Sequence, residues 1–193
     1  MKLLKEVEDN LLSFVKEVFQ NAEWDYFHTL ACVSIMKKLI LIEGGDERIL
    51  VPVMYLHDIG YAGQLKNGYT LEQRLKVKKN HMLIGAKKAK LFLDKIGFSS
   101  SEIKKICNLI KVHDNLIGKK SFEETLVIEA DSLGQIAPSV SVNNFGEDEF
   151  AKYVEIFEKK RVPMFKTRTG KKLLEVFVNQ NKLFLKCTKS FKK

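Results

Sequence analysis

Apolar residues recur along this 193-residue chain with the period of an α-helix almost throughout. The first apolar stripe consists of Leu4, Val7, Leu11, Val15 and Val18, which lie three or four residues apart. The alternation of apolar and polar residues that is typical of strands is hardly visible. The pattern therefore predicts an all-α protein, a compact bundle of about seven to eight helices.

Capping and helix-breaking residues divide this pattern into segments. The second helix should cover about residues 25–42 and end at the glycine pair 44–45. Asp46 can cap a third helix, which ends at Gly60. Pro52 lies inside this third segment and predicts either a kink or a late start of the helix.

The second half of the chain carries further start and stop signals. Ser99 and Glu102 have the S-x-x-E form of a capping box, which predicts a helix that opens there and ends near Gly118. The other predicted segments are a glycine-containing loop over 61–69, a long helix over about 70–95, a helix over about 122–137, a polar loop over 138–146 and a last helical pair broken around Val162 and Pro163. We expect one domain over residues 1–193, with the C-terminal helices over 145–190 packed on the rest.

Composition narrows the class of protein. Hydrophobic residues make up 45% of the chain and charged residues 30%, as in ordinary soluble proteins. We find no apolar stretch long enough for a signal peptide or a membrane span, so we expect no membrane association. The cysteines, Cys32, Cys107 and Cys187, are odd in number and lack C-x-x-C spacing. This argues against a disulfide framework and a zinc–thiolate site, and it predicts a cytoplasmic protein.

The net charge of +9 bears on the partner. Much of the excess lies in the segments 74–90 and 159–172. Such a charge suits nucleic acid, an anionic membrane or a small phosphorylated molecule, and lysine-rich helices also simply keep a protein soluble. Because no basic strand is interleaved with aromatic residues, nucleic acid gains little support. The sequence leaves the oligomeric state open.

Several polar residues lie on apolar helical stripes, so periodicity points them inward. They are His28, His57, His81, His113 and Asp131. A single inward histidine is most often a hydrogen-bonded core residue, and this interpretation holds for each one alone. Together with Asp58, however, they would need several separate buried partners, whereas one shared cation satisfies them all.

The residue types indicate which cation this would be. Neutral imidazoles mixed with carboxylates suit a divalent transition metal such as Mn, Fe, Co, Ni or Zn, and are too rich in nitrogen for Ca or Mg alone. Adjacent residues differ by about 100° around a helix. His57 and Asp58 can therefore both reach one ion only near a helix end, where Gly60 places them.

The ordered set of His28, the pair His57-Asp58 and Asp131 resembles the HD-domain superfamily of metal-dependent phosphohydrolases, whose signature is H…HD…D. The resemblance covers about residues 25–135, and residues 57–60 have the HDIG form. It implies an HD-domain bundle in which His28, His57, Asp58 and Asp131 hold one divalent metal. It also implies that His57 and Asp58 are the catalytic residues.

His81 and His113 stand where two-metal members of the superfamily carry further histidines. By this resemblance they would bind a second ion, Asp58 would bridge the two ions, and a hydroxide between them would attack phosphorus. The alternative is a single ion with a histidine nearby as substrate contact or proton shuttle. The implied cofactor is one or two divalent transition metal ions.

One position departs from the superfamily pattern. Many members follow HDIG with lysine, whereas this chain has Tyr61, so contacts to a substrate phosphate must come from elsewhere. Asp114 is expected to face solvent or to orient a ligand. The candidate substrate contacts, each of which is alternatively solvated surface, are Lys66, Arg74, Lys78 and Arg168.

The sequence thus predicts a phosphohydrolase that cleaves a phosphoester or phosphoanhydride of a nucleotide or related small molecule. Two alternatives remain open on the same scaffold: a non-catalytic regulatory or nucleotide-binding module, and a di-iron oxygenase. The chain has no G-x-x-x-x-G-K, G-x-S-x-G or H-E-x-x-H motif. These absences remove support for P-loop, serine hydrolase and zincin functions.

Overall fold

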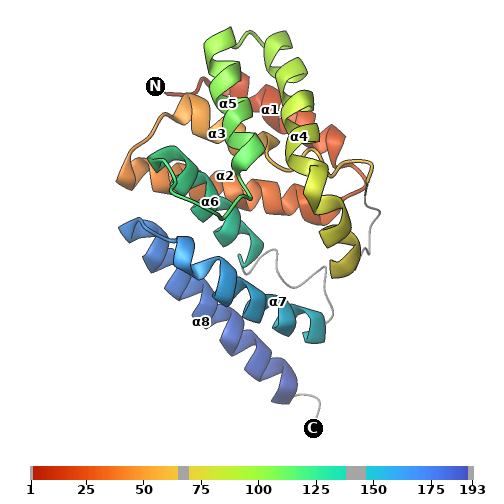
Figure 1. The fold of residues 1–193 in the computed structure, drawn as a ribbon, viewed down its shortest axis with the longest axis vertical. Helices are drawn as coiled ribbons and strands as arrows, with labels where there is room; N and C mark the ends of the chain where they lie inside the picture. The colour runs from red at the N-terminus through yellow and green to blue at the C-terminus, as the bar shows by residue number, and fades with distance from the viewer. Residues whose placement is uncertain (1, 65–69, 138–146, 191–193) are drawn as a thin grey trace.

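All regular secondary structure in the described part of the chain is helical (Figure 1). The computed structural model describes residues 2–64, 70–137 and 147–190, with the backbone alone at residues 71, 74, 79, 147–151 and 184–190. The helices are α1 (Lys5–Val18), α2 (Glu23–Glu43), α3 (Glu47–Leu56), α4 (Leu71–Lys95), α5 (Ser100–Val112), α6 (Phe122–Gln135), α7 (Glu147–Lys160), the short 3₁₀ helix η1 (Val162–Met164) and α8 (Arg168–Ser190). The prediction of an all-α bundle is confirmed.

Side chains at the helix starts explain where several helices begin. The Ser99 hydroxyl accepts a hydrogen bond from the Glu102 amide, and the Glu102 carboxylate accepts one from the Ser99 amide, as the capping box predicts. Capping boxes of the same form open α4, with Thr70 and Gln73, and α6, with Ser121 and Glu124. At α3 the Asp46 carboxylate accepts from the Arg48 amide at 3.1 Å.

Glu102 makes stability depend on pH. A hydrogen bond from Arg48, followed by bonds from Ser99, lowers the pKa of Glu102 from 4.5 to about 2. This contribution to stability is therefore fully present above pH 4.5 and is lost as the pH falls towards 2. We expect the free energy of unfolding to drop by about 2 kcal/mol over this interval. Urea unfolding at several pH values should show that Glu102→Gln lacks this drop; an equal drop in the variant would contradict the assignment.

Several predicted boundaries differ from the structure. The third helix ends at Leu56 and not at Gly60. The second helix begins at Glu23, two residues before the expected start. The late start of α3 is wrong, because Asp46 caps the helix and Pro52 lies within it. The fifth helix ends at Val112 and not near Gly118. Beyond it, the Asn115 side chain accepts from the Ile117 amide at 3.0 Å, a local bond that competes with helix continuation.

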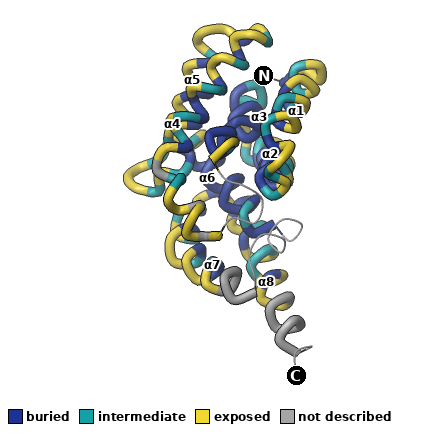
Figure 2. The backbone as a smooth tube through the Cα atoms, turned by 90° about the vertical axis from the view of Figure 1, so that its right-hand side faces the viewer, coloured by how far each residue is buried: buried dark blue, intermediate teal, exposed yellow. Residues whose placement is uncertain are grey.

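Helices α3 and α6 form the centre of the molecule. Every residue from Ile49 to Leu56 in α3 is buried, and so is every residue from Thr125 to Gly134 in α6. Helix α2 packs against both of them, and α4 packs against α5. Figure 2 shows this buried interior in dark blue inside a largely exposed outer surface. A helix that is apolar all round belongs in such an interior, so polar residues on α3 and α6 are held far from bulk water.

The C-terminal helices are attached to this interior through a buried carboxylate. Helix α8 packs against α6 and α2. Glu129 of α6 accepts hydrogen bonds from the amides of Lys166 and Thr167 at 2.6 and 2.8 Å, just before α8 begins. A Cβ at Gly170 would lie 2.1 Å from Glu129 Oε2, so the contact requires glycine there. That residues 1–193 form one domain stays a prediction.

None of the helices in the described segments is both long and apolar enough to cross a membrane.

Candidate metal centre

The structure brings together all six residues that the sequence predicts as metal ligands. Each is at most 3% exposed. His57 and Asp58 directly follow the end of α3, and His113 directly follows the end of α5. The other three come from inside α2, α4 and α6: His28, His81 and Asp131. Five separate helices therefore converge on one buried point.

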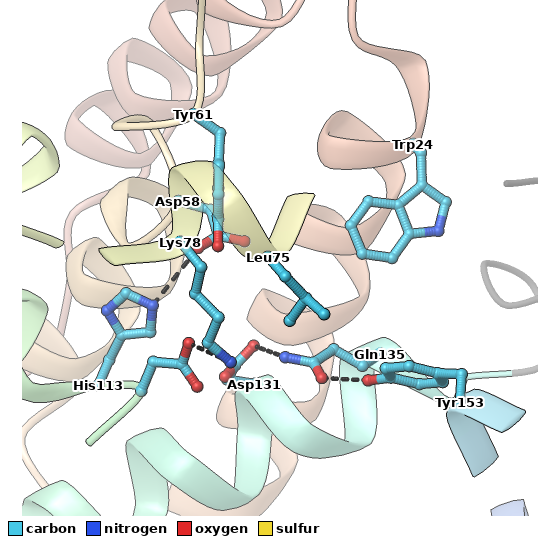
Figure 3. Close-up of a pocket in the computed structure, with 10 residues that line it drawn as sticks. Trp24, Asp58, Tyr61, Leu75, Lys78, His113, Asp131, Gln135 and Tyr153 are labelled. Carbon is cyan, nitrogen blue, oxygen red and sulfur yellow. Dashed lines mark hydrogen bonds and ion pairs between the residues drawn. The ribbon is translucent and has the colours of Figure 1, made fainter. Parts of the chain in front are cut away.

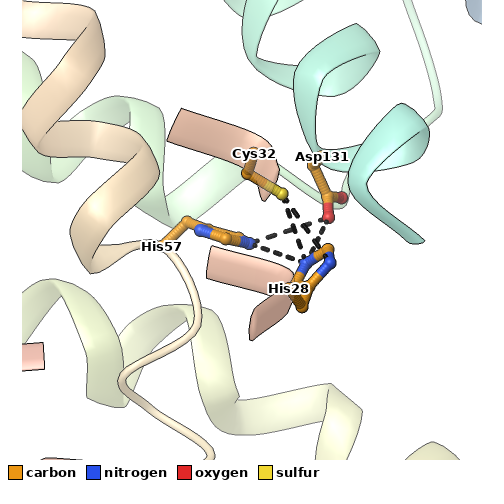
Figure 4. A group of neighbouring side chains, drawn as sticks. All are labelled: His28, Cys32, His57 and Asp131. Carbon is orange, nitrogen blue, oxygen red and sulfur yellow. Dashed lines mark hydrogen bonds and ion pairs between the residues drawn. The ribbon is translucent and has the colours of Figure 1, made fainter. Parts of the chain in front are cut away.

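Four ligand atoms form what we call the first cluster: Nε2 of His28, Nε2 of His57, Oδ2 of Asp58 and Oδ1 of Asp131. The two imidazole nitrogens are 3.2 Å apart. Asp131 Oδ1 lies 3.3 Å from His28 Nε2 and 3.7 Å from His57 Nε2. Asp58 Oδ2 lies 3.6 and 3.5 Å from the same nitrogens. Figure 4 shows His28, His57 and Asp131 pointing toward one another.

Three ligand atoms form the second cluster: Nε2 of His81, Nε2 of His113 and Oδ1 of Asp58. The two nitrogens are 3.1 Å apart, and each lies 3.4 Å from Asp58 Oδ1. Asp58 thus faces the first cluster with one oxygen and the second cluster with the other. This is the arrangement that a carboxylate bridging two ions requires.

The spacing and chemistry of both clusters fit divalent metal ions. Ligand atoms about 2.1 Å from an ion lie about 3.0 Å apart in octahedral and about 3.4 Å apart in tetrahedral geometry. The distances of 3.1 to 3.7 Å in the two clusters begin just above the octahedral value and span the tetrahedral one. Mixed imidazole and carboxylate donors suit Mn, Fe, Co, Ni or Zn. Both clusters can therefore hold such an ion.

The comparisons with known proteins agree with this geometry. A family model for the HD domain matches residues 25–135, which is more than half of the chain. The chain belongs to the HD-domain family. The fold also matches the crystal structure of a predicted HD superfamily hydrolase from an uncultured Thermotogales bacterium, with a TM-score of 0.64 over 96% of this chain and 92% of that one, at 18% sequence identity. A search of curated proteins gave no match.

Three imidazoles of this HD domain are oriented by main-chain carbonyls three residues before them. His57 Nδ1–H donates to the carbonyl oxygen of Met54 at 2.8 Å. His81 Nδ1–H donates to that of Lys78 at 2.6 Å, and His113 Nδ1–H donates to that of Ile110 at 2.7 Å. A carbonyl can only accept, so Nδ1 carries a proton, and in the neutral ring the lone pair lies on Nε2, which faces the cluster. Such outer contacts fix the tautomer and ring orientation that a metal needs.

The charges around the first cluster favour a cation. Burial alone would lower the pKa of His28, but the negative charges of Cys32, Asp131 and Asp58 outweigh it and raise the pKa to about 10. Burial would raise the pKa of Asp131, but Arg161 and the two imidazoles hold it well below its usual value. The carboxylates at this buried point therefore draw positive charge onto the imidazoles, and a bound divalent ion would supply that charge in place of the protons.

His81 in the second cluster is neutral at pH 7. Burial lowers its pKa to about 4, against the attraction of Asp58. Tyr61 covers the imidazole, with ring centroids 4.2 Å apart and planes 12° from parallel. Tyr61 stands where many HDIG members have lysine. It therefore contributes an aromatic contact to the metal-ligand candidate His81 in place of a cation.

Cys32 also belongs to the site, a position that its spacing in the sequence does not indicate. Its Sγ lies within 4.8 Å of ligand atoms of His28, His57 and Asp131. The distances to the two ring nitrogens of His28 are nearly equal, 3.5 Å to Nε2 and 3.7 Å to Nδ1. This places Sγ away from the axis of the Nε2 lone pair, so Cys32 contacts the imidazole. Gly134 leaves room for it, since a Cβ there would lie 2.2 Å from Sγ.

A pocket of about 60 Å³ opens beside the two clusters (Figure 3). It offers space for about two water molecules next to the ligands Asp58, His113 and Asp131. Aromatic and apolar side chains form other parts of its lining, among them Trp24, Tyr61, Leu75 and Tyr153. The space beside the clusters therefore suits a small polar group of a larger ligand.

The predicted substrate contacts have different outcomes. Lys78 lines the pocket, and its Nζ lies 2.7 Å from Asp114 Oδ2. Arg168 is exposed at the first position of α8 and is not one of the described residues around the pocket. Lys66 lies outside the described residues, and only the backbone of Arg74 is described.

Asp114 corrects one expectation. Its side chain is 5% exposed, so the prediction that it faces solvent is wrong. It lies between two cations, Lys78 and Arg161, whose attraction outweighs burial and lowers its pKa. The alternative expectation, that Asp114 orients another group, agrees with this position.

Proposed function

We propose that this HD-domain protein is a metal-dependent phosphohydrolase that cleaves a phosphoester or phosphoanhydride of a small phosphorylated molecule such as a nucleotide. One observation carries the proposal: the two oxygens of Asp58 face two separate histidine pairs. Paired metal sites of this kind are common among enzymes that transfer phosphoryl groups. The name of the structural neighbour, a predicted HD superfamily hydrolase, points to the same class.

The ligand residues divide between two ions in this proposal. The first cluster would hold one ion and the second cluster the other, with Asp58 shared. Bound ions of this type polarise phosphoryl oxygens and lower the pKa of water to near neutrality. The protein's part is to hold the imidazoles in one tautomer, as the carbonyls of Met54, Lys78 and Ile110 do.

Among the cations that the structure describes, Lys78 is the one best placed to bind the substrate phosphate. Its side chain lies at the pocket, is 39% exposed and pairs with the buried Asp114. Asp114 holds the ammonium group beside the metal ligands, where it can donate hydrogen bonds to a phosphoryl oxygen. The net charge of +9 would assist the approach of an anionic substrate.

A combined metal and substrate screen tests the proposed function. The protein, loaded in turn with Mn, Co, Ni, Zn or Fe, is assayed with phosphomonoesters, phosphodiesters and nucleotides, and oxygen uptake is recorded. We expect hydrolysis that a chelator abolishes. Oxygen consumption by the iron form without hydrolysis would indicate an oxygenase, and nucleotide binding by calorimetry without turnover would indicate a regulatory module. Either result would contradict the proposal.

Lys78→Met should weaken substrate binding and leave the metals in place. A charge-assisted hydrogen bond to phosphate contributes about 1.5–3 kcal/mol, so we expect KM to rise about 10- to 100-fold. Steady-state kinetics on the best substrate of the screen measures this. Lys76→Met is the matched control, since Lys76 is 72% exposed and pairs with Glu72 on the surface. Equal effects of the two substitutions would rule out a specific role for Lys78.

A further inference from the structure

Asp131 has contacts on both of its carboxylate oxygens. Oδ1 faces the first cluster and also accepts a hydrogen bond from Gln135 Nε2 at 2.8 Å. Gln135 in turn accepts from the hydroxyl of Tyr153 on α7 (Figure 3). Oδ2 accepts from a guanidinium nitrogen of Arg161 at 2.8 Å. Tyr153 and Arg161 both lie beyond residues 25–135, the part that matches the HD-domain family.

Arg161 is itself fixed by several partners. It is 6% exposed and follows the end of α7. The nitrogen that contacts Asp131 also donates to the Ser132 hydroxyl at 2.9 Å, and the other terminal nitrogen donates to Asp114. A planar guanidinium between two carboxylates holds both in one geometry, which a lysine ammonium cannot do.

These contacts form a continuous chain from the metal centre to the pocket. Asp131 contacts Arg161, Arg161 contacts Asp114, and Asp114 contacts Lys78. The Arg161 guanidinium therefore orients Asp131 of the first cluster and, through Asp114, also Lys78 at the pocket. A ligating carboxylate held in this way binds its metal more tightly, because its outer contacts fix its rotamer.

We propose that Arg161 is a positioning residue, which holds Asp131 in its metal-binding orientation and, through Asp114, holds Lys78 at the pocket. The segment beyond residue 135 thereby completes the metal centre of the HD domain. This inference rests on the metal centre of the proposed function, but its test needs metal binding alone and no substrate.

The experiment measures Mn²⁺ binding by calorimetry in the full chain and in Arg161→Met and Arg161→Lys. We expect Arg161→Met to lower the affinity of the first cluster for Mn²⁺ by about 10- to 100-fold, which is the usual effect of losing a contact to a metal ligand. Arg161→Lys should fall between Arg161→Met and the unmodified protein. The second cluster should keep its affinity. The substitution His81→Asn removes a ligand of the second cluster only. Arg161→Met combined with it should show the same loss of ion affinity, which would assign that loss to the first cluster.

Arg48→Met is the matched control. Arg48 is in the first turn of α3, where it pairs with Glu102 and lies over the Phe98 ring. Its loss should therefore leave ion binding unchanged. If Arg161→Met does not fold, two other variants carry the test. One is Arg161→Lys. The other is the double variant Arg161→Met/Asp114→Asn, in which Asp114 no longer leaves a buried negative charge when the arginine is lost.

Three outcomes would overturn the inference. Unchanged ion affinity in the folded Arg161 variants would overturn it alone. Equal weakening at both clusters would also overturn it alone, because that is the result of a general loss of structure. Failure of the unmodified protein to bind any ion would overturn the proposed function as well, so the two failures are distinguishable.

Discussion

We expect Asp58→Asn to abolish binding of both proposed ions and, with them, the proposed hydrolysis. Asparagine keeps the size of the side chain but replaces one carboxylate oxygen with an amide NH₂, which cannot bind a metal. Each cluster receives one oxygen of Asp58, so the NH₂ group faces one histidine pair and the negative charge is lost from both. We expect turnover to fall by about 1,000-fold or more, since metal ions contribute several kcal/mol of transition-state stabilisation. Elemental analysis after dialysis and the hydrolysis assay measure the two effects.

Asp46→Asn is the matched control for Asp58→Asn. It makes the same chemical change at the other end of α3, where Asp46 caps the helix and asparagine caps about equally well. Circular dichroism should show unchanged helical content in both variants. Retention of both ions and of full activity in Asp58→Asn would disprove the shared-carboxylate assignment.

Gly60→Ala should be among the most destabilising single-methyl changes in the protein. A Cβ at residue 60 would lie 1.9 Å from the carbonyl oxygen of His81 and 2.8 Å from the amide nitrogen of Gly85. Both are main-chain atoms of α4, which cannot rotate away, so the helix itself must shift and carry His81 with it. We expect the free energy of unfolding to fall by about 3 kcal/mol and the second cluster to lose its ion. Chemical denaturation and elemental analysis measure the two losses.

Gly85→Ala tests the same helix contact from the other side. Its Cβ would lie 3.3 Å from the carbonyl oxygen of His57, a distance that a shift of a few tenths of an ångström relieves. Alanine also stabilises a helix interior by up to about 1 kcal/mol relative to glycine. We therefore expect Gly85→Ala to be close to neutral. If Gly60→Ala were as mild, the close approach of the turn after α3 to α4 would not be the reason for this glycine.

The helices could be predicted because their signals are local. The apolar period and the cap at Asp46 define α3, and the box of Ser99 and Glu102 defines the start of α5. The end of α5 could not be placed, because Asn115 interrupts the helix through its own side-chain bond to a nearby amide. Gly60 was expected to end the third helix, whereas α3 ends at Leu56 and Gly60 allows main-chain contact with α4.

The candidate metal ligands could be predicted because five of them interrupt apolar stripes, and because His28, His57, Asp58 and Asp131 match the HD signature. Arg161 could not, since it lies inside the basic segment 159–172, where one buried cation looks the same as its exposed neighbours. Its partners, Asp131 and Asp114, lie 30 and 47 residues away in the chain, a separation that no local pattern reveals.

The orientation of His57 and His113 depends on where their helices stop. Each imidazole donates to a last-turn carbonyl, that of Met54 or Ile110, which has no amide partner within its helix. One further residue of helix would supply that amide, which would then share the carbonyl with the ring, as inside α4 at Lys78 and His81. Transplanting this centre into another helical scaffold therefore requires copying two chain terminations as well as the six side chains, because at both of them the carbonyl that orients the ring has no helical amide to share.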